Sequence, residues 1–169
     1  MENNKWVNII KNILYYVLII GVAILIKMFV FSPIKINGTS MAPTLKDGEL
    51  MILNEIGYHL NGLERFDIAV ANVNGEKLIK RVIGLPGETV EFRDNELYIN
   101  GKLTIENFKH GETNDFQLSE PIPNDYYFLV GDNRGNSKDS RSIGLIHKSK
   151  IMGKTNFIIF PFNRIGSVR

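Results

Sequence analysis

The sequence predicts a mainly β domain preceded by one N-terminal transmembrane helix. Residues 13–31 are apolar with four exceptions, and a helix of this length spans about 28 Å, close to the hydrocarbon thickness of a bilayer. After Pro33 no long helical period recurs, and short β-type runs alternate with turn signals. With 169 residues, 44% of them hydrophobic and 22% charged, the chain suits one domain with a core and an appendage.

The apolar stretch is interpreted as a retained anchor. A cleaved signal peptide is the alternative, because Lys5 and Lys11 supply positive charge before the apolar run. Residues 29–33, however, contain no small-x-small pair at which such a peptide would be cut. We therefore expect a short segment at 1–12, a transmembrane anchor at 13–31 and a folded domain at 32–169.

Seven runs in the folded domain are predicted to be strands. They lie between turn signals and comprise residues 49–54, 67–71, 77–83, 89–92, 96–99, 126–130 and 154–160. The pair Asn100-Gly101 is typical of a hairpin turn, and residues 93–95 predict another turn before it. Residues 104–124 are polar and acidic, and are interpreted as a surface loop or small insertion.

Composition argues against several classes of function. The chain has no cysteine, which excludes disulfides, thiolate metal sites and a cysteine nucleophile. Its net charge of +2 is spread along the sequence without a basic run, so no nucleic-acid partner is expected. Residues 131–141 are rich in oxygen donors but lack the ligand spacing of an EF-hand loop, and we expect neither a metal nor a cofactor.

A polar turn at residues 37–44 presents the first candidate catalytic residue, Ser40. Gly38 allows the backbone to bend and approach a ligand closely, and Pro43 fixes the exit from the turn. The Ser40 hydroxyl is thereby presented rather than packed. An ordinary structural turn is the alternative at this point.

The predicted strand at residues 77–83 carries the second candidate, Lys80. Side chains alternate along a strand, so Lys80 and Arg81 lie on opposite faces, each among apolar neighbours. Burial lowers the pKa of an ammonium group and makes the neutral amine available as a general base. Arg81 stays charged and, if buried, needs a carboxylate partner. An exposed lysine on an edge strand is the alternative for Lys80.

A third polar cluster, residues 131–141, directly follows the strand that ends at Val130. It is interpreted as a ligand-binding or catalytic loop, with a solvated turn whose charges pair locally as the alternative.

The order of these three segments resembles the type I signal peptidases, the bacterial leader peptidases, and in particular their short Gram-positive Ser-Lys type. The resemblance covers most of the chain. It rests on the N-terminal anchor and on four motifs: SMAPT at 40–44, KRVIGLPG at 80–87, GDNRGNSKDSR at 131–141 and PFNRIG at 161–166.

The resemblance implies a membrane-bound serine endopeptidase that cuts signal peptides from exported preproteins after a small-x-small (Ala-x-Ala) motif. Ser40 would be the nucleophile and a neutral Lys80 the general base. The Ser40 backbone N–H would contribute to the oxyanion hole, and Met41 would bind substrate. The residues implied to support the site are Ser137, which would orient the lysine amine, and an ion-pair network of Asp132, Asp139, Arg81 and Arg141.

The same resemblance implies a fold and a location. The fold would consist of curved antiparallel sheets of the signal-peptidase type. The protein would cross the bacterial cell membrane once, with a cytoplasmic N-terminus and an extracytoplasmic catalytic domain. Its partners would be signal peptides and membrane lipid.

Two positions depart from the family pattern. Gly38 stands where Gram-negative members carry a second serine that donates to the oxyanion, so any second donor here must be another group. Phe66 stands where the third motif of the family usually has glycine.

Two other functions compete with this one. A repressor-type self-cleaving protease shares the Ser-Lys chemistry but would begin with a DNA-binding domain, whereas this chain begins with an apolar span. A catalytically silent homologue acting as an assembly or chaperone factor, for instance in pilus building, would be marked by loss of the serine or lysine. Both are present here.

Overall fold

The computed structural model describes the backbone of residues 2–30 and 32–168, and the side chains of residues 5–22 and 32–168. The chain divides into two units, Met1–Ser32 and Pro33–Arg169, each of which is described by itself.

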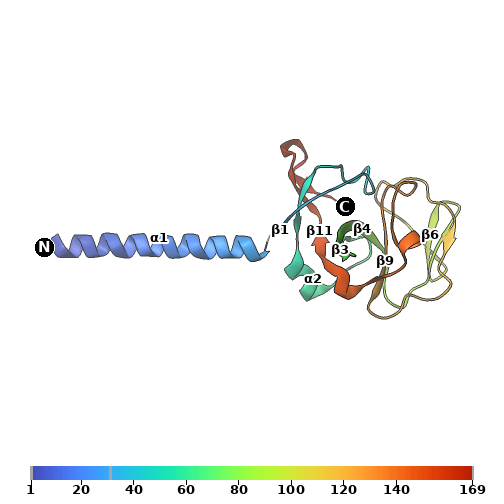
Figure 1. Ribbon diagram of the computed structural model, residues 1–169, viewed down its shortest axis with the longest axis horizontal. Coiled ribbons are helices and arrows are strands. Elements are labelled where there is room, and N and C mark those ends of the chain that lie inside the picture. Colours follow the sequence, from blue (N-terminus) through green and yellow to red (C-terminus); the bar gives the residue numbers. More distant parts are fainter. Residues whose placement is uncertain (1, 31, 169) are drawn as a thin grey trace. The chain divides into compact units, whose positions relative to one another are not determined.

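The first unit is the single helix α1 (Glu2–Val30) (Figure 1). Its stretch Lys5–Val22 has a mean hydropathy of 1.3 and is long and apolar enough to cross a membrane. Residues 13–30 of the predicted anchor lie in α1, and Phe31 lies outside the described residues. The helix begins well before residue 13, because residues 2–12 contain neither glycine nor proline to interrupt it.

The second unit is mainly β, as predicted, and its described strands form three sheets. The first has the order β1 (Ser32–Lys35), β2 (Leu50–Leu53), β12 (Phe157–Phe160), β13 (Gly166–Ser167). The second has the order β10 (Ile146–His147), β9 (Tyr126–Val130), β4 (Glu76–Gly84), β3 (Ile68–Val73), β11 (Ile151–Thr155). The third has the order β7 (Lys102–Thr104), β6 (Glu96–Ile99), β5 (Val90–Arg93), β8 (Phe116–Gln117).

The strands run antiparallel wherever their register is described, and several are bulged. Register shifts interrupt the ladders between β4 and β9, β3 and β11, and β2 and β12. Bulges bend a strand and increase its twist, which suits sheets that curve around a core. Figure 1 shows β4 in the middle of the second sheet, close to β3 and β9.

The predicted hairpin turns are confirmed. Asp94 and Asn95 join β5 to β6 with φ values of 52° and 66°, and Asn100 and Gly101 join β6 to β7 with values of 52° and 74°. Positive φ at both central residues is the requirement of a type I′ turn, which Asn, Asp and Gly meet at least cost.

One predicted strand was wrong, and several short elements were not predicted, among them β1, β8, β10 and β13. The run 154–160 is not one strand, because it breaks at Asn156 into β11 and β12, which belong to different sheets. The short helix α2 (Glu55–Asn61) was not predicted. It begins directly after β2, where the Asn54 side chain accepts a hydrogen bond from the Gly57 N–H and caps the helix.

Both faces of the second sheet are covered by buried apolar side chains. Along β3, Ile68 and Val70 belong to one buried cluster and Ala69 and Ala71 to another. The sheet is therefore an inner layer, and side chains on either face of β4 are shielded from solvent. This placement explains how two consecutive cations on β4 are both buried.

Candidate active site

Ser40 lies in the turn that connects β1 to β2. The turn is closed by a hydrogen bond from the Ala42 N–H to the Thr39 carbonyl (3.0 Å). Gly38 has a φ of 85° and its N–H donates to Asp47 Oδ1 (2.7 Å), which fixes the entry to the turn. Among the described residues, the Ser40 N–H donates to no acceptor.

The Lys80 amine meets the Ser40 hydroxyl. Nζ lies 2.6 Å from Ser40 Oγ and also donates to the carbonyl of Ile79 (3.1 Å). Lys80 is only 4% exposed, so the alternative of a lysine left in water is wrong. Burial lowers the pKa of the Lys80 amine, and the negative charges of Asp139 and Asp132 oppose this effect without cancelling it.

The loop after β9 is tied to the serine turn by backbone contacts. The Asn133 N–H donates to the Ser40 carbonyl (3.0 Å), and Asn133 Nδ2 donates to the Thr39 carbonyl (3.1 Å). A Cβ at Gly131 would come within 2.4 Å of the Ser40 carbonyl oxygen and 2.2 Å of Ser137 Oγ. Only glycine therefore allows the loop and the turn to approach this closely.

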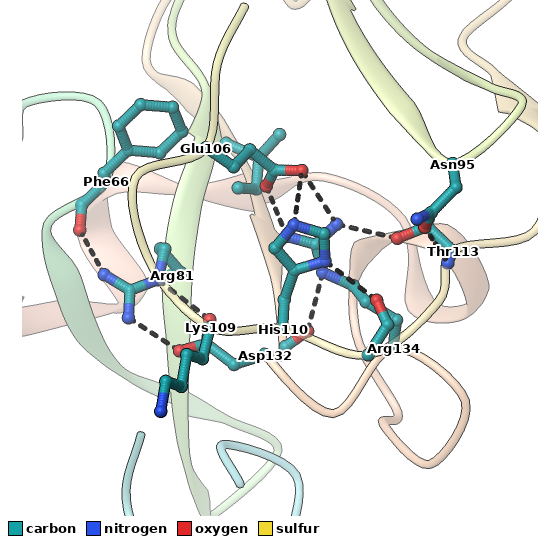
Figure 2. Close-up of polar contacts among 12 residues, drawn as sticks. Phe66, Arg81, Asn95, Glu106, Lys109, His110, Thr113, Asp132 and Arg134 are labelled. Atoms are coloured by element: carbon teal, nitrogen blue, oxygen red, sulfur yellow. Dashed lines mark hydrogen bonds and ion pairs between the residues drawn. The ribbon is translucent and has the colours of Figure 1, made fainter. Parts of the chain in front are cut away.

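Arg81 and Asp132 form a buried bidentate pair, as the sequence led us to expect for a buried arginine (Figure 2). Arg81 Nε donates to Asp132 Oδ1 (2.8 Å) and Nη2 donates to Oδ2 (2.6 Å), and the two side chains are 1% and 0% exposed. Arg81 Nη1 donates to the Phe66 carbonyl (2.8 Å), and the guanidinium carbon lies 3.9 Å from the centre of the Phe108 ring. The pair joins β4 to the loop that begins at Gly131.

Asp139 and Arg141, the other two members of the expected ion-pair network, form a second ion pair. Arg141 Nε and Nη2 donate to the two carboxylate oxygens of Asp139 at 2.9 and 2.8 Å, and the Gly131 N–H donates to Asp139 Oδ2 (3.0 Å). Burial alone would raise the pKa of the Asp139 carboxyl, but these hydrogen bonds outweigh burial and hold the pKa below its ordinary value. Asp139 also caps the short helix α3 (Ser140–Ile143).

Ser137 lies beside the site, but no hydrogen bond joins it to Lys80 in the part of the chain that the structure describes. Its Oγ is buried and has no hydrogen-bond partner there. The hydroxyl is close enough to Asp139 to help lower the pKa of that carboxyl, although the geometry falls short of a hydrogen bond. The Ser137 hydroxyl, next to Gly131, is therefore available to form a hydrogen bond.

A groove runs past Ser40 and Lys80. Its lining combines the segment that leads into the serine turn with the first half of β4 and one residue of the loop: Ile36, Asn37, Ser40, Met41, Gly75, Glu76, Lys77, Leu78, Ile79, Lys80 and Lys138. Met41 is only 1% exposed and also belongs to a buried cluster. In the described ladders, residues 76–80 of β4 pair with β3 alone, because β9 pairs only with residues 81–84. Half of β4 therefore offers an open strand edge to the groove.

Phe66 occupies a backbone conformation that explains the usual glycine of the family. Its φ is 72°, in the left-handed region that side chains with a Cβ rarely adopt. Its N–H donates to the Val82 carbonyl (2.8 Å), its own carbonyl accepts from Arg81, and its ring packs edge-on against Phe108. These two hydrogen bonds to its backbone and the ring contact together hold Phe66 in this conformation.

Sequence reasoning missed several contributors to the site. Thr44 Oγ1 donates to Asp132 Oδ2 (2.5 Å), Asn133 holds the serine turn, and Arg134 pairs with Glu106. The first three lie inside motifs that were recognised, although no role was assigned to them. Glu106 lies in the predicted insertion, and nothing in its local pattern marks it.

The chain is similar in sequence to known proteins. The family described as "Signal peptidase, peptidase S26" matches residues 7–160. Signal peptidase I of Bacillus amyloliquefaciens is 39% identical over 88% of this chain and 86% of its own length. Signal peptidase IB of Staphylococcus aureus (strain COL) is 40% identical over 90% of this chain and 92% of its own length.

A solved structure is also similar. The crystal structure of a signal peptidase I from Enterococcus faecalis V583 superposes with a TM-score of 0.51 at 40% sequence identity. The match covers 54% of this chain and 95% of that one.

Proposed function

Since the chain belongs to the signal peptidase family, peptidase S26, we propose that it is a membrane-bound serine endopeptidase that removes signal peptides from exported preproteins. The observation that carries the proposal is the 2.6 Å contact between Ser40 Oγ and the buried amine of Lys80, whose pKa is lowered by burial. A neutral amine at that distance accepts the hydroxyl proton, which activates the serine as a nucleophile.

The proposed peptide-bond cleavage uses the side chains of Ser40 and Lys80 and one backbone hydrogen-bond donor, the Ser40 N–H. Lys80 takes the proton of Ser40 as Oγ attacks the scissile carbonyl carbon, and the Ser40 N–H stabilises the oxyanion. The lysine then donates its proton to the departing amine, leaving an acyl ester on Ser40. Lys80 next removes a proton from water as the water oxygen attacks the ester carbonyl carbon. The bond to Ser40 Oγ then breaks, Lys80 returns the proton to Oγ, and the signal peptide leaves with a new carboxylate. No metal or cofactor takes part in this sequence.

The ion pairs around Ser40 and Lys80 position the loop and take no part in proton transfer. Arg81 with Asp132 and Arg141 with Asp139 hold the loop at 131–141 against the serine turn. Ser137 Oγ is buried without a hydrogen-bond partner among the described residues, and we propose that it orients the Lys80 amine.

The substrate would bind as an added strand. The open edge of β4 at residues 76–80 offers backbone N–H and C=O groups to an extended peptide, which is a recurrent mode of peptide recognition. Met41 lines the same groove and is 1% exposed. We propose that it contacts the small side chains that precede the cut, as in an Ala-x-Ala motif.

Location follows from the anchor. We propose that α1 spans the bacterial cell membrane once, with the N-terminus in the cytoplasm and the catalytic domain outside, where exported chains emerge. Signal peptides and membrane lipid would then be its partners. The repressor-type alternative is disfavoured because the matching family and the similar proteins are signal peptidases. The silent homologue is disfavoured because Ser40 and Lys80 lie in contact.

The test is cleavage of preproteins by the full-length chain in detergent. Preproteins with an Ala-x-Ala motif should be cut directly after it, as read by mass spectrometry, and matched preproteins with a bulky residue in place of either alanine should resist. Failure of the folded protein to cut any preprotein would overturn the proposal in favour of a silent homologue.

A further inference from the structure

A buried ion pair lies behind the catalytic loop, outside the groove. Arg134, in the loop, faces the carboxylate of Glu106, in the segment between β7 and β8, and their side chains are 0% and 5% exposed. Arg134 Nη1 donates to Glu106 Oε2 (3.3 Å) and Nη2 donates to Oε1, as Figure 2 shows. Removing one member of a buried pair leaves the other charge uncompensated.

Further contacts fix the orientation of the Arg134 guanidinium. Nη1 donates to Thr113 Oγ1 (2.8 Å), and Nε donates to the Gly131 carbonyl (3.1 Å). The guanidinium carbon lies 5.1 Å from the centre of the Phe92 ring. Arg134 therefore bridges the start of its own loop and the segment that carries Glu106.

The same arginine stands next to the residue that holds the nucleophile. Asn133 directly precedes Arg134, and its N–H donates to the Ser40 carbonyl (3.0 Å). The Arg134 carbonyl accepts from Arg141 Nη2 (2.9 Å), and Arg141 pairs with Asp139. A shift of Arg134 would move both of these contacts.

From these contacts we infer that Glu106 is a positioning residue for the nucleophile: by neutralising and orienting Arg134, its carboxylate holds the loop at 131–139 against the Ser40 turn. Glu106 itself lines neither the groove nor the dyad. It acts through Arg134 and Asn133 on the Ser40 carbonyl, and so on the direction of the Ser40 hydroxyl and N–H. The inference rests on the proposed peptidase function.

The test compares Glu106→Gln with the wild type, both as full-length chains in detergent. Glutamine has nearly the size of glutamate and keeps one oxygen that can accept a hydrogen bond from Arg134, so the variant should fold, but its side chain carries no charge. We expect kcat on a signal-peptide substrate to fall about tenfold to a hundredfold while KM changes by less than about twofold, because alignment is lost and the groove is untouched. Glu112→Gln is the matched control, since Glu112 is exposed in the same segment and has no hydrogen bond or ion pair among residues 32–168.

A double variant separates positioning from stability. Glu106→Leu combined with Arg134→Met removes both buried charges and should recover the thermal stability lost by Glu106→Leu alone. It should not recover kcat, because the link from Glu106 to the loop is gone. Recovery of kcat in step with Tm would overturn the inference, as would wild-type kcat in folded Glu106→Gln.

A second readout needs no activity. Hydrogen exchange of the Asn133 N–H reports its bond to the Ser40 carbonyl, and we expect exchange in peptides covering 131–141 to quicken about tenfold or more in Glu106→Gln but not in Glu112→Gln. If the wild type cuts no substrate, the proposed function fails, while unchanged exchange in Glu106→Gln would refute the positioning role by itself.

Discussion

Lys80 and Arg81 are adjacent, both buried and both basic, yet they meet opposite environments. Arg81 faces Asp132, which neutralises it through two hydrogen bonds. Lys80 faces a serine hydroxyl and a carbonyl, and the nearby carboxylates of Asp132 and Asp139 are engaged by Arg81 and Arg141. The alternation of a β-strand therefore gives Arg81 a counter-ion and leaves Lys80 without a direct one, in a buried position that lowers the pKa of its amine.

Ser40→Ala tests the nucleophile. The substitution removes one hydroxyl from a half-buried turn residue, so cleavage should be abolished while Tm stays within about 2 °C of the wild type. Cleavage and thermal melting are measured on the same detergent preparation. Residual turnover that survives purification to homogeneity would identify a different nucleophile.

Asp132→Asn tests the buried pair. Arg81 would keep its charge in a 1% exposed site with a neutral partner, and we expect the free energy of unfolding to fall by about 3–5 kcal/mol. Urea denaturation in a fixed detergent measures the loss. Glu91→Gln is the control, because it breaks the solvent-exposed pair with Arg93 and should cost less than about 1 kcal/mol. Equal losses in the two variants would show that burial of the Arg81 pair carries no special penalty.

At the scale of elements, the site is an association of one turn, one strand and one loop from distant parts of the chain. Gly131 is the point of closest approach, where the loop backbone touches both the Ser40 carbonyl and Ser137. The backbone on one side and a buried hydroxyl on the other leave no room for a side chain.

Gly131→Ala should therefore separate the loop from the turn. A Cβ would lie 2.4 Å from a backbone oxygen that cannot rotate away, so we expect kcat to fall by about a hundredfold or more. Gly135→Ala is the matched control in the same loop, because nothing lies within 4 Å of the position that its new methyl group would take and its φ is not positive. Kinetics of both variants on one substrate give the comparison, and near-wild-type kcat in Gly131→Ala would mean that the contact is not needed.

The sequence predicted most strands because alternation and turn residues are local signals. Both hairpin turns were recognised from Asp, Asn and Gly, which adopt positive φ more readily than other residues. The break at Asn156 was not predicted because residues 154–160 contain neither glycine nor proline to mark where the strand ends, and nothing local reveals that its halves join different sheets. Helix α2 has a local signal in the Asn54 cap, but its seven residues are too few to show a helical period.

At the scale of the molecule, the motifs identified Ser40 and Lys80 as partners, whereas contacts that depend on long-range packing could not be predicted from them. Ser40 and Lys80 were found through their motifs, and the structure brings them into contact. Glu106 could not be found in this way, because its partner Arg134 is 28 residues away and the pairing depends on how the loop folds back. The predicted bond between Ser137 and Lys80 stays a prediction.

The division into two units predicts that the catalytic domain works without its anchor. A fragment of residues 32–169 keeps all of β1 and should fold, melt cooperatively and cut a short soluble peptide with kcat within about tenfold of the full chain. It should lose more activity on preproteins embedded in lipid vesicles, because α1 no longer holds it at the membrane. A fragment that folds but cuts no peptide would show that α1 supplies more than attachment.

The central claim is that Lys80 is the general base, and the most direct measurement is the pH dependence of kcat for the wild type and for Lys80→Arg. Burial lowers the pKa of Lys80, so the neutral amine accumulates as pH rises. Wild-type kcat should climb with pH and level off below 10.5, the ordinary pKa of lysine. Lys80→Arg keeps the charge but cannot release its proton, so it should fold and show no activity at any pH tested. Substantial turnover by folded Lys80→Arg with the same rising limb would contradict the account.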